Sequence, residues 1–188
     1  MAGKSFLLVG ALALLLACPA LLATPVAGRT IGQIVRADRE LTDLAYVLRT
    51  HNAGGELDDR RRTLTMFAPT NGAFRKLGRC FGVPSPQIQA VMAFARKFAT
   101  VDFDQDVRRS VLYHATPGAR SWKDLRGSVG YQSLLRGSKY WVSTSADEQG
   151  LVGVTPHFPV ARVLNRGAPI RADNGLIYKV DLPLLPLN

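Results

Sequence analysis

The feature that restricts the fold most is a strand followed directly by a helix, within Thr63–Phe74. The first residues of this stretch alternate and are rich in strand formers, which predicts a β-strand. Pro69 then breaks the strand, because its ring fixes φ and removes a hydrogen-bond donor. Thr70 or Asn71 can cap the helix that follows, which we expect over Gly72–Leu77. The apolar side chains of this helix would face a buried core.

Further helices are expected on both sides of this unit. Thr30 and Gln33 match a capping box, in which each side chain bonds the backbone N–H of the other residue. Ser85 followed by Pro86 is a favourable helix start, and Asp104 is expected to begin another helix. The apolar stripes of these helices are spaced at three and four residues. They are Leu41, Leu44, Ala45 and Leu48; Ile88, Val91, Met92 and Ala95; and Val107, Val111 and His114.

The second half of the chain changes to a period of two, which is typical of strands. This pattern favours strands at Tyr140–Val142, Gly150–Val154 and Val160–Leu164. Asp173–Gly175 contains an Asn-Gly pair, a strong signal for a tight turn between two strands, and alternation resumes over Leu176–Val180. Because helices come first and strands mostly later, the sequence predicts an α+β fold in which helices pack on a β-sheet wedge.

Three stretches together resemble the signatures of the fasciclin domain family. Thr63–Phe74 is similar to a strand that runs into Phe-Ala-Pro-Thr-Asn and a short helix with a phenylalanine. Val111–Gly118 resembles a Leu-x-Tyr-His-x-x-x-Gly segment in the middle of the domain. Ala172–Asp181, followed by Leu184–Pro186, resembles the closing signature Asn-Gly-x-x-His-x-x-Asp and Leu-Leu-Pro. Order and spacing agree from about Thr30 to Pro186, nearly the whole chain after the N-terminal segment.

The resemblance implies a fasciclin-like scaffold. Two features depart from the family pattern: Tyr178 stands where the family usually has histidine, and Val83–Phe103 is longer than the usual connection. A fold does not by itself define a function, so these departures bear on the partner rather than on the scaffold. The residues to which the motifs give a structural role are Phe67, Pro69, Thr70, Asn71, Phe74, Asn174, Gly175 and Asp181.

The N-terminus predicts a signal peptide over residues 1–23. A positive charge precedes the apolar run Phe6–Ala17, which is shorter than the ~20 residues that span a bilayer, and small residues follow it. We expect cleavage within residues 20–27, which leaves residues 24–188 as a single secreted domain without a transmembrane segment. If the source is bacterial, Cys18 could instead carry a lipid anchor.

The chain is strongly basic, with 24 Lys and Arg against 14 Asp and Glu and a formal net charge of +10. Such an excess favours acidic partners. Because a secreted protein is not expected to meet nucleic acid, we expect an extracellular protein receptor or an acidic polysaccharide of a matrix or cell wall. The basic residues are spread along the sequence, so an evenly solvated surface is the simpler interpretation.

The pair Tyr113 and His114 is the first candidate for contact with such a partner. The resemblance implies this role, since the Tyr-His pair of animal fasciclin domains is associated with receptor binding, particularly to integrins. The residues themselves favour a structural role. His114 shares a helix face with Val107 and Val111, where a polar group is usually satisfied internally, and Tyr113 can pack its ring and bond through its hydroxyl.

Arg60, Arg61 and Arg62 form the second candidate, in a loop before the first signature strand. Guanidinium groups bind sulfate or carboxylate in a bidentate manner, so a loop with three of them suits an acidic glycan. The simpler interpretation is a solvated turn, in which Asp58 and Asp59 balance the charge.

No motif for catalysis or metal binding was found, and the histidines lack ligand spacing. We therefore expect no enzymatic activity, no metal and no cofactor. Cys80, at a predicted helix end, is expected to be buried. Two alternatives stay open. One is a carrier of a small apolar ligand or lipid, which needs a cavity of a few hundred Å³. The other is a hydrolase or lyase that uses His114 with Asp102, Asp104 or Asp106.

Overall fold

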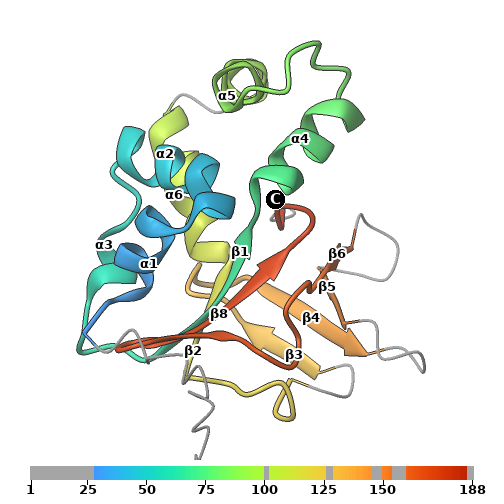
Figure 1. Cartoon of the computed structure of the whole chain (residues 1–188). Coiled ribbons are helices and arrows are strands. Elements are labelled where there is room, and N and C mark those ends of the chain that lie inside the picture. Colours follow the sequence, from blue (N-terminus) through green and yellow to red (C-terminus); the bar gives the residue numbers. More distant parts are fainter. Residues whose placement is uncertain (1–27, 100–101, 126–128, 145–149, 154–159, 186–188) are drawn as a thin grey trace, which may run out of the picture.

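The computed structural model describes residues 28–99, 102–125, 129–144, 150–153 and 160–185. Its described strands form two four-stranded sheets, and its helices lie together on one side of them (Figure 1). The predicted α+β class, with helices packed on a β-sheet wedge, is therefore confirmed, and the described strands of this wedge form two sheets. The predicted signal peptide lies outside the described residues.

The first sheet is mixed and carries the strands that the sequence motifs predicted. Its central strands, β1 (Leu64–Pro69) and β8 (Gly175–Val180), run parallel, from the Leu64–Gly175 pair to the Pro69–Val180 pair. All residues of β1 are buried. The prediction that these two strands share one core is confirmed. In spatial order the sheet comprises β2 (Ala115–Pro117), β1 (Leu64–Pro69), β8 (Gly175–Val180) and β7 (Ile170–Ala172).

The second sheet is antiparallel throughout. An isolated bridge between Val163 and Val180 joins the chain just after its last strand to the end of β8. This bridge and the packing between the sheets fix their relative position. In spatial order the sheet comprises β3 (Val129–Gln132), β4 (Lys139–Thr144), β5 (Gly150–Gly153) and β6 (Ala161–Arg162).

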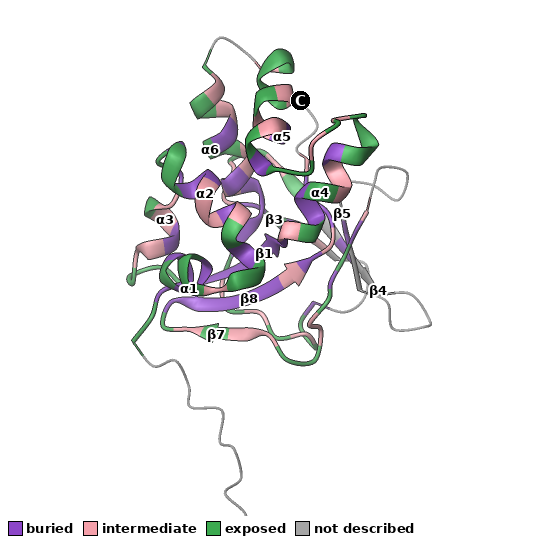
Figure 2. Ribbon diagram, turned by 45° about the horizontal axis from the view of Figure 1, so that its top comes forward, coloured by how far each residue is buried: buried purple, intermediate pink, exposed green. Residues whose placement is uncertain are grey.

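The helices are short and cover the face of the first sheet that points away from the second sheet (Figure 1). They bury their inner faces and expose their outer ones, as the purple and green surfaces of Figure 2 show. They are α1 (Ile31–Ala37), η1 (Arg39–Leu41), α2 (Thr42–Thr50), α3 (Gly55–Asp58), α4 (Asn71–Cys80), α5 (Ile88–Ala95), η2 (Arg96–Phe98) and α6 (Phe103–Tyr113).

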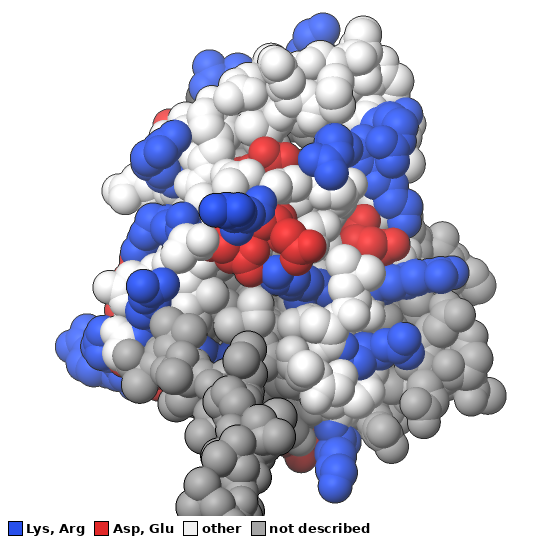
Figure 3. Space-filling model, viewed as in Figure 1, with Lys and Arg blue, Asp and Glu red and all other residues white. Residues whose placement is uncertain are grey.

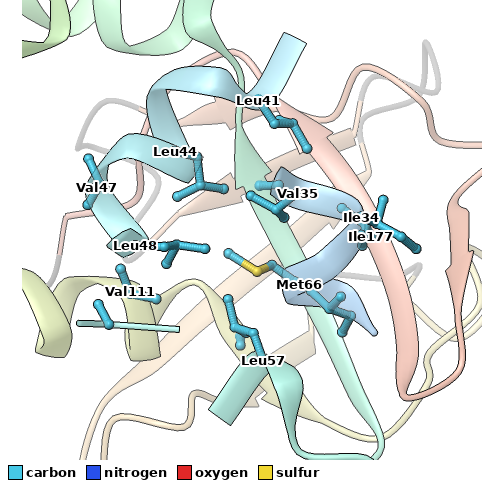
Figure 4. Close-up of a cluster of buried hydrophobic side chains, with 14 of the residues drawn as sticks. Ile34, Val35, Leu41, Leu44, Val47, Leu48, Leu57, Met66, Val111 and Ile177 are labelled. Atoms are coloured by element: carbon cyan, nitrogen blue, oxygen red, sulfur yellow. The ribbon is translucent and has the colours of Figure 1, made fainter. Parts of the chain in front are cut away.

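Alternation along the central strands divides the core into two clusters. Met66 of β1 and Ile177 of β8 point to the helices and join an aliphatic cluster, shown in Figure 4. Phe67 and Tyr178 point the other way, into a cluster between the two sheets that contains several tyrosines. The period of two in a strand produces this division, since successive side chains lie on opposite faces.

The predicted caps of two helices are present. Thr30 accepts from the backbone N–H of Gln33, and the Gln33 side chain accepts from the N–H of Thr30, so the capping box is complete. Thr70 caps α4 by accepting a hydrogen bond from the N–H of Ala73 at 3.2 Å. Each cap satisfies donors that a helix start leaves without a partner.

Helix α4 extends beyond the predicted end at Leu77. Gly78 is buried within it, and a Cβ there would lie 3.0 Å from Cγ2 of Val91, so glycine permits close packing of α5. The helix is ended instead by Gly82, at φ +68°, where the N–H groups of Gly82 and Val83 bond the carbonyls of Arg79 and Gly78 in a Schellman pattern. Since α4 runs on, Cys80 is exposed, and the prediction that it is buried was wrong.

Two other helix starts also differ from the prediction. Helix α5 begins at Ile88, because Ser85 Oγ accepts from the N–H of Gln87 and forms a turn before the helix. Helix α6 begins at Phe103, and its cap is Asp102, whose side chain accepts from the N–H of Gln105. Among the described residues, no helix is long and apolar enough to cross a membrane.

Candidate functional site

His114 closes α6 and lies inside the protein. Its side chain is 5% exposed. Nδ1 lies 2.7 Å from the carbonyl oxygen of Ser110, and Nε2 accepts a hydrogen bond from the N–H of Leu184 at 2.8 Å. Since Nε2 accepts, the ring proton is on Nδ1 and is donated to Ser110, so the imidazole is neutral. Burial lowers the pKa of His114 to about 4, which agrees with a neutral ring.

Tyr113 points to the opposite side of α6 and belongs to the cluster between the sheets. Its hydroxyl donates to the carbonyl of Lys139 in β4 at 3.1 Å, and its ring meets that of Tyr140 edge to face at 5.8 Å. Burial raises the pKa of Tyr113 to about 12. Tyr113 and His114 therefore fasten α6 to β4 and to the C-terminal segment, and their predicted role in receptor binding stays a prediction.

The three arginines of the loop are exposed but engaged. Nη1 of Arg60 lies 2.6 Å from the Asp173 carboxylate. Arg61 and Arg62 share Asp59, at 3.2 Å and 3.4 Å. Hydrogen bonds from the backbone and side chain of Arg61 lower the pKa of Asp59, so this carboxylate stays charged and offsets part of the loop's charge. A binding role for the triplet stays a prediction.

The residues of the closing motif join distant parts of the chain. Asn174 is 1% exposed. Its Oδ1 accepts from the N–H of Ile31 at 2.8 Å, and its Nδ2 donates to the carbonyls of Leu57 and Asp59. Gly175 adopts φ +145°, and a Cβ there would overlap the Leu64 carbonyl of the neighbouring strand. The turn therefore holds the start of α1 and the loop after α3 against β8.

The other motif residues have comparable structural contacts. Asn71 accepts from the N–H of Asp43 and donates to the carbonyl of Arg39, each at 2.9 Å. Asp181 accepts from the N–H of Arg162 and pairs with Lys76 at 2.8 Å. Phe67 stacks on Tyr178 at 5.8 Å.

Tyr178, which replaces the family's usual histidine, is fully buried and donates its hydroxyl hydrogen to the carbonyl of Arg120 at 3.1 Å. Tyr178 is thus a residue of the core. The tyrosine that stands in place of the family's histidine therefore adds no ionisable group to the surface.

The structure also contains a cavity of about 450 Å³ between the helices, which no single motif in the sequence marks. It lies beside the aliphatic cluster, and several side chains of Figure 4, Leu44, Val47, Met66 and Val111, form part of its wall. Spacing within each helix predicts an apolar face, but the distance between two such faces depends on how the helices cross. Phe98 lines this cavity and is 75% exposed.

The acidic residues considered as partners of His114 in a hydrolase or lyase have other contacts in the structure. Asp102 caps α6, and Oδ1 of Asp104 lies 2.7 Å from Nδ1 of His51. Asp106 lines the cavity together with His114, but both ring nitrogens of His114 are bonded to the backbone. Neither ring nitrogen of His114 is thus left for a carboxylate. The described residues also hold no group of three or more His, Cys, Asp or Glu placed to bind a metal ion.

A second set of basic side chains lies on the helices. Arg75 and Arg79 of α4, Lys97 of η2 and Arg108 of α6 are all exposed, and within the described part of the chain none of them forms a salt bridge. Figure 3 shows basic side chains over much of one face of the molecule, while the acidic ones gather near its centre. The cations of the helices are thus less compensated than those of the loop.

The architecture is that of an α+β protein with two sheets. It has a mixed sheet with a parallel central pair, short helices on one face and an antiparallel sheet on the other. The family model of the fasciclin domain matches residues 39–186. The chain therefore belongs to the fasciclin domain family.

Comparison with solved structures supports the fold. A similar structure is a FAS1 domain pair from the insect cell adhesion molecule fasciclin I, with a TM-score of 0.65 at 18% sequence identity. The match covers 84% of this chain and 51% of that chain, so this chain spans about half of that solved relative. A search of curated proteins gave no match.

Proposed function

We propose that the protein is a secreted adhesion module that binds an acidic polysaccharide outside the cell. Membership of the fasciclin family and the likeness to a domain pair of a cell adhesion molecule support adhesion as the general role. The signal-peptide pattern of residues 1–23 supports export. The net charge of +10 favours a sulfated or uronic glycan over a neutral one.

The observation that carries the proposal is the difference between the two basic sets. The loop triplet has Asp59 and Asp173 as counter-ions, whereas Arg75, Arg79, Lys97 and Arg108 form no salt bridge within the described residues. A cation that is already paired must lose its partner before it binds a new anion. The helical set, which we call the helical cations, can bind sulfate or carboxylate without breaking a salt bridge of the described residues.

Retention on heparin and pectin columns tests the proposal. A variant with all four helical cations changed to glutamine should bind on the order of thirtyfold more weakly, from about 0.5 kcal/mol for each exposed ion pair. The matched control changes Arg60, Arg61 and Arg62 to glutamine and should elute close to the unmodified protein.

Elution of the unmodified protein at the low salt of a neutral control protein would refute the glycan as partner. Equal losses in the two variants would refute the helical cations as the contact surface. Binding to cells that persists in high salt would favour a protein receptor instead, since exposed charge pairs are screened by salt.

A further inference from the structure

The cavity between the helices has the size and lining of a small-molecule site. Its volume of about 450 Å³ lies in the range of roughly 300–1,000 Å³ that is usual for such sites. Its walls come from β1, α2, α4, α5, η2, α6 and the segment that follows β8, and their side chains are mainly aliphatic and aromatic. Phe74, Val91, Met92 and Phe103 are representative.

Flexible side chains make up part of this lining. Met92 is partly buried against the aliphatic cluster and faces the cavity. A thioether side chain adapts to irregular shapes, so a wall that contains it suits a flexible alkyl chain.

The polar groups of the cavity are few and come mainly from α6. Arg109 is exposed and lines the cavity, and within the described residues it forms no salt bridge. The guanidinium of Arg96 lies 5.0 Å from the ring centroid of Phe103, a ring of the cavity wall. Of the nearby carboxylates, Asp104 is bonded to His51 at 2.7 Å, and Asp106 has an interaction of its own within the chain. Arg96 does not line the cavity and is attracted to Asp104, so Arg109 is the guanidinium of the cavity wall that is left to meet an anion.

An apolar path connects this region with the surface. Phe98 lines the cavity and is 75% exposed. Its ring lies 5.1 Å from that of Phe94, which in turn lies 5.8 Å from that of Phe81, 52% exposed. Exposed aromatic residues in contact with one another cost hydration free energy and often mark a binding site.

From these observations we propose that the cavity binds one long-chain carboxylic acid. The alkyl chain occupies the apolar cavity, and the carboxylate is held by Arg109. The exposed phenylalanines guide the chain from a membrane or micelle into the cavity. This binding uses residues other than the helical cations, so it goes beyond glycan adhesion and is independent of it.

Calorimetric titration of the purified protein with saturated carboxylates from decanoate to palmitate is the first test. Burial of each further methylene contributes about 0.8 kcal/mol, so affinity should rise about fourfold per methylene until the cavity is full. Palmitate should bind with one-to-one stoichiometry, and its methyl ester should bind about tenfold more weakly, because it lacks the charge that Arg109 meets. An absence of saturable binding would overturn the proposal.

Two pairs of variants then locate the ligand. Met92→Trp should fill the cavity and abolish palmitate binding, whereas Met92→Leu, which conserves volume, should bind normally. Arg109→Gln should weaken palmitate about tenfold and leave the methyl ester unchanged. Its neighbour Arg108 does not line the cavity, so Arg108→Gln should change neither ligand.

The same variants give the outcomes that would refute the proposed carboxylic acid site. If Met92→Trp folds and binds palmitate as the unmodified protein does, the ligand lies elsewhere. If Arg109→Gln and Arg108→Gln weaken palmitate equally, the carboxylate is not held at Arg109, and the proposal is wrong on that point even when Met92→Trp does not fold. Retention of Met92→Trp on heparin should be unchanged, which separates this proposal from the adhesion proposal.

Discussion

The two faces of the central sheet are packed in different ways. On one face, Phe67, Tyr113, Tyr140 and Tyr178 form ring pairs at 5.5 to 5.8 Å between the two sheets. On the other face, aliphatic residues of the helices lie over the same strands, and a cavity of about 450 Å³ remains among them. One strand, β1, contributes to both faces through alternate side chains.

This difference indicates a division of labour. Large rigid rings have few rotamers, and the hydroxyls of Tyr113 and Tyr178 each find a carbonyl, so this face fixes the relation between the sheets. The starts of α1 and α4 are fixed by caps and by the Asn174 turn, and the inner faces of the helices pack in the aliphatic cluster. The cavity lies beside this cluster, between the helices. We therefore assign stability to the aromatic face and binding to the helical face.

The sharpest contrast between the faces should come from truncation of a side chain on each. Phe67→Ala removes a fully buried ring and should lower the free energy of unfolding by about 3–5 kcal/mol. Met92→Ala should cost only about 1 kcal/mol, since Met92 is partly buried and already borders empty space. Urea unfolding followed by circular dichroism measures both. Equal losses would break the comparison.

The pH dependence of stability tests the buried state of His114, which lies at the end of α6 and is bonded to the C-terminal segment. Its pKa is about 4 in the folded protein and 6.5 in the unfolded chain. The unfolded chain therefore takes up the proton first, and stability that is complete above pH 6.5 is lost progressively as the pH falls toward 4. The loss is roughly 3 kcal/mol, at 1.36 kcal/mol per pKa unit.

The His114→Gln variant should be less stable at neutral pH and should lack this part of the pH dependence. Proton NMR of the ring measures the pKa directly. A His114 ring that titrates near its ordinary value would mean that the imidazole is solvated, which would reopen it as a surface contact.

The Asn174 turn tests how firmly the helices are held. Asn174→Ala removes three hydrogen bonds and leaves the buried N–H of Ile31 without an acceptor, at a cost of about 1–3 kcal/mol. Hydrogen exchange should then accelerate in α1 and leave β3 and β4 protected. Uniform acceleration across both regions would show that the two faces unfold as one unit.

Local chemistry explains which parts of this structure the sequence could predict. The strand before Pro69, the Thr70 cap and the Asn174–Gly175 turn depend on neighbouring residues, and all three were confirmed. The internal hydrogen bond of His114 also follows from its place on an apolar helix face. Each of these features is determined mainly by residues that are close to it in the sequence.

Features that depend on the approach of distant elements could not be predicted. From the sequence, Gly78 is a residue expected to end a helix. In the structure it lies inside α4 and permits close packing against Val91. The exposure of Cys80 follows from that one difference. The cavity depends on the crossing of α5 and α6, which no periodicity encodes, and the counter-ion Asp173 of Arg60 lies in a different part of the chain.

The assignment of binding to the helical face can be tested most directly by amide NMR during titration with a heparin oligosaccharide. The account predicts that the shifted signals cluster in α4, η2 and α6, around Arg79, Lys97 and Arg108. The signals of β3 and β4 and of the loop around Arg61 should stay in place. Shifts that cluster instead at Arg60–Arg62 or on the second sheet would contradict the account.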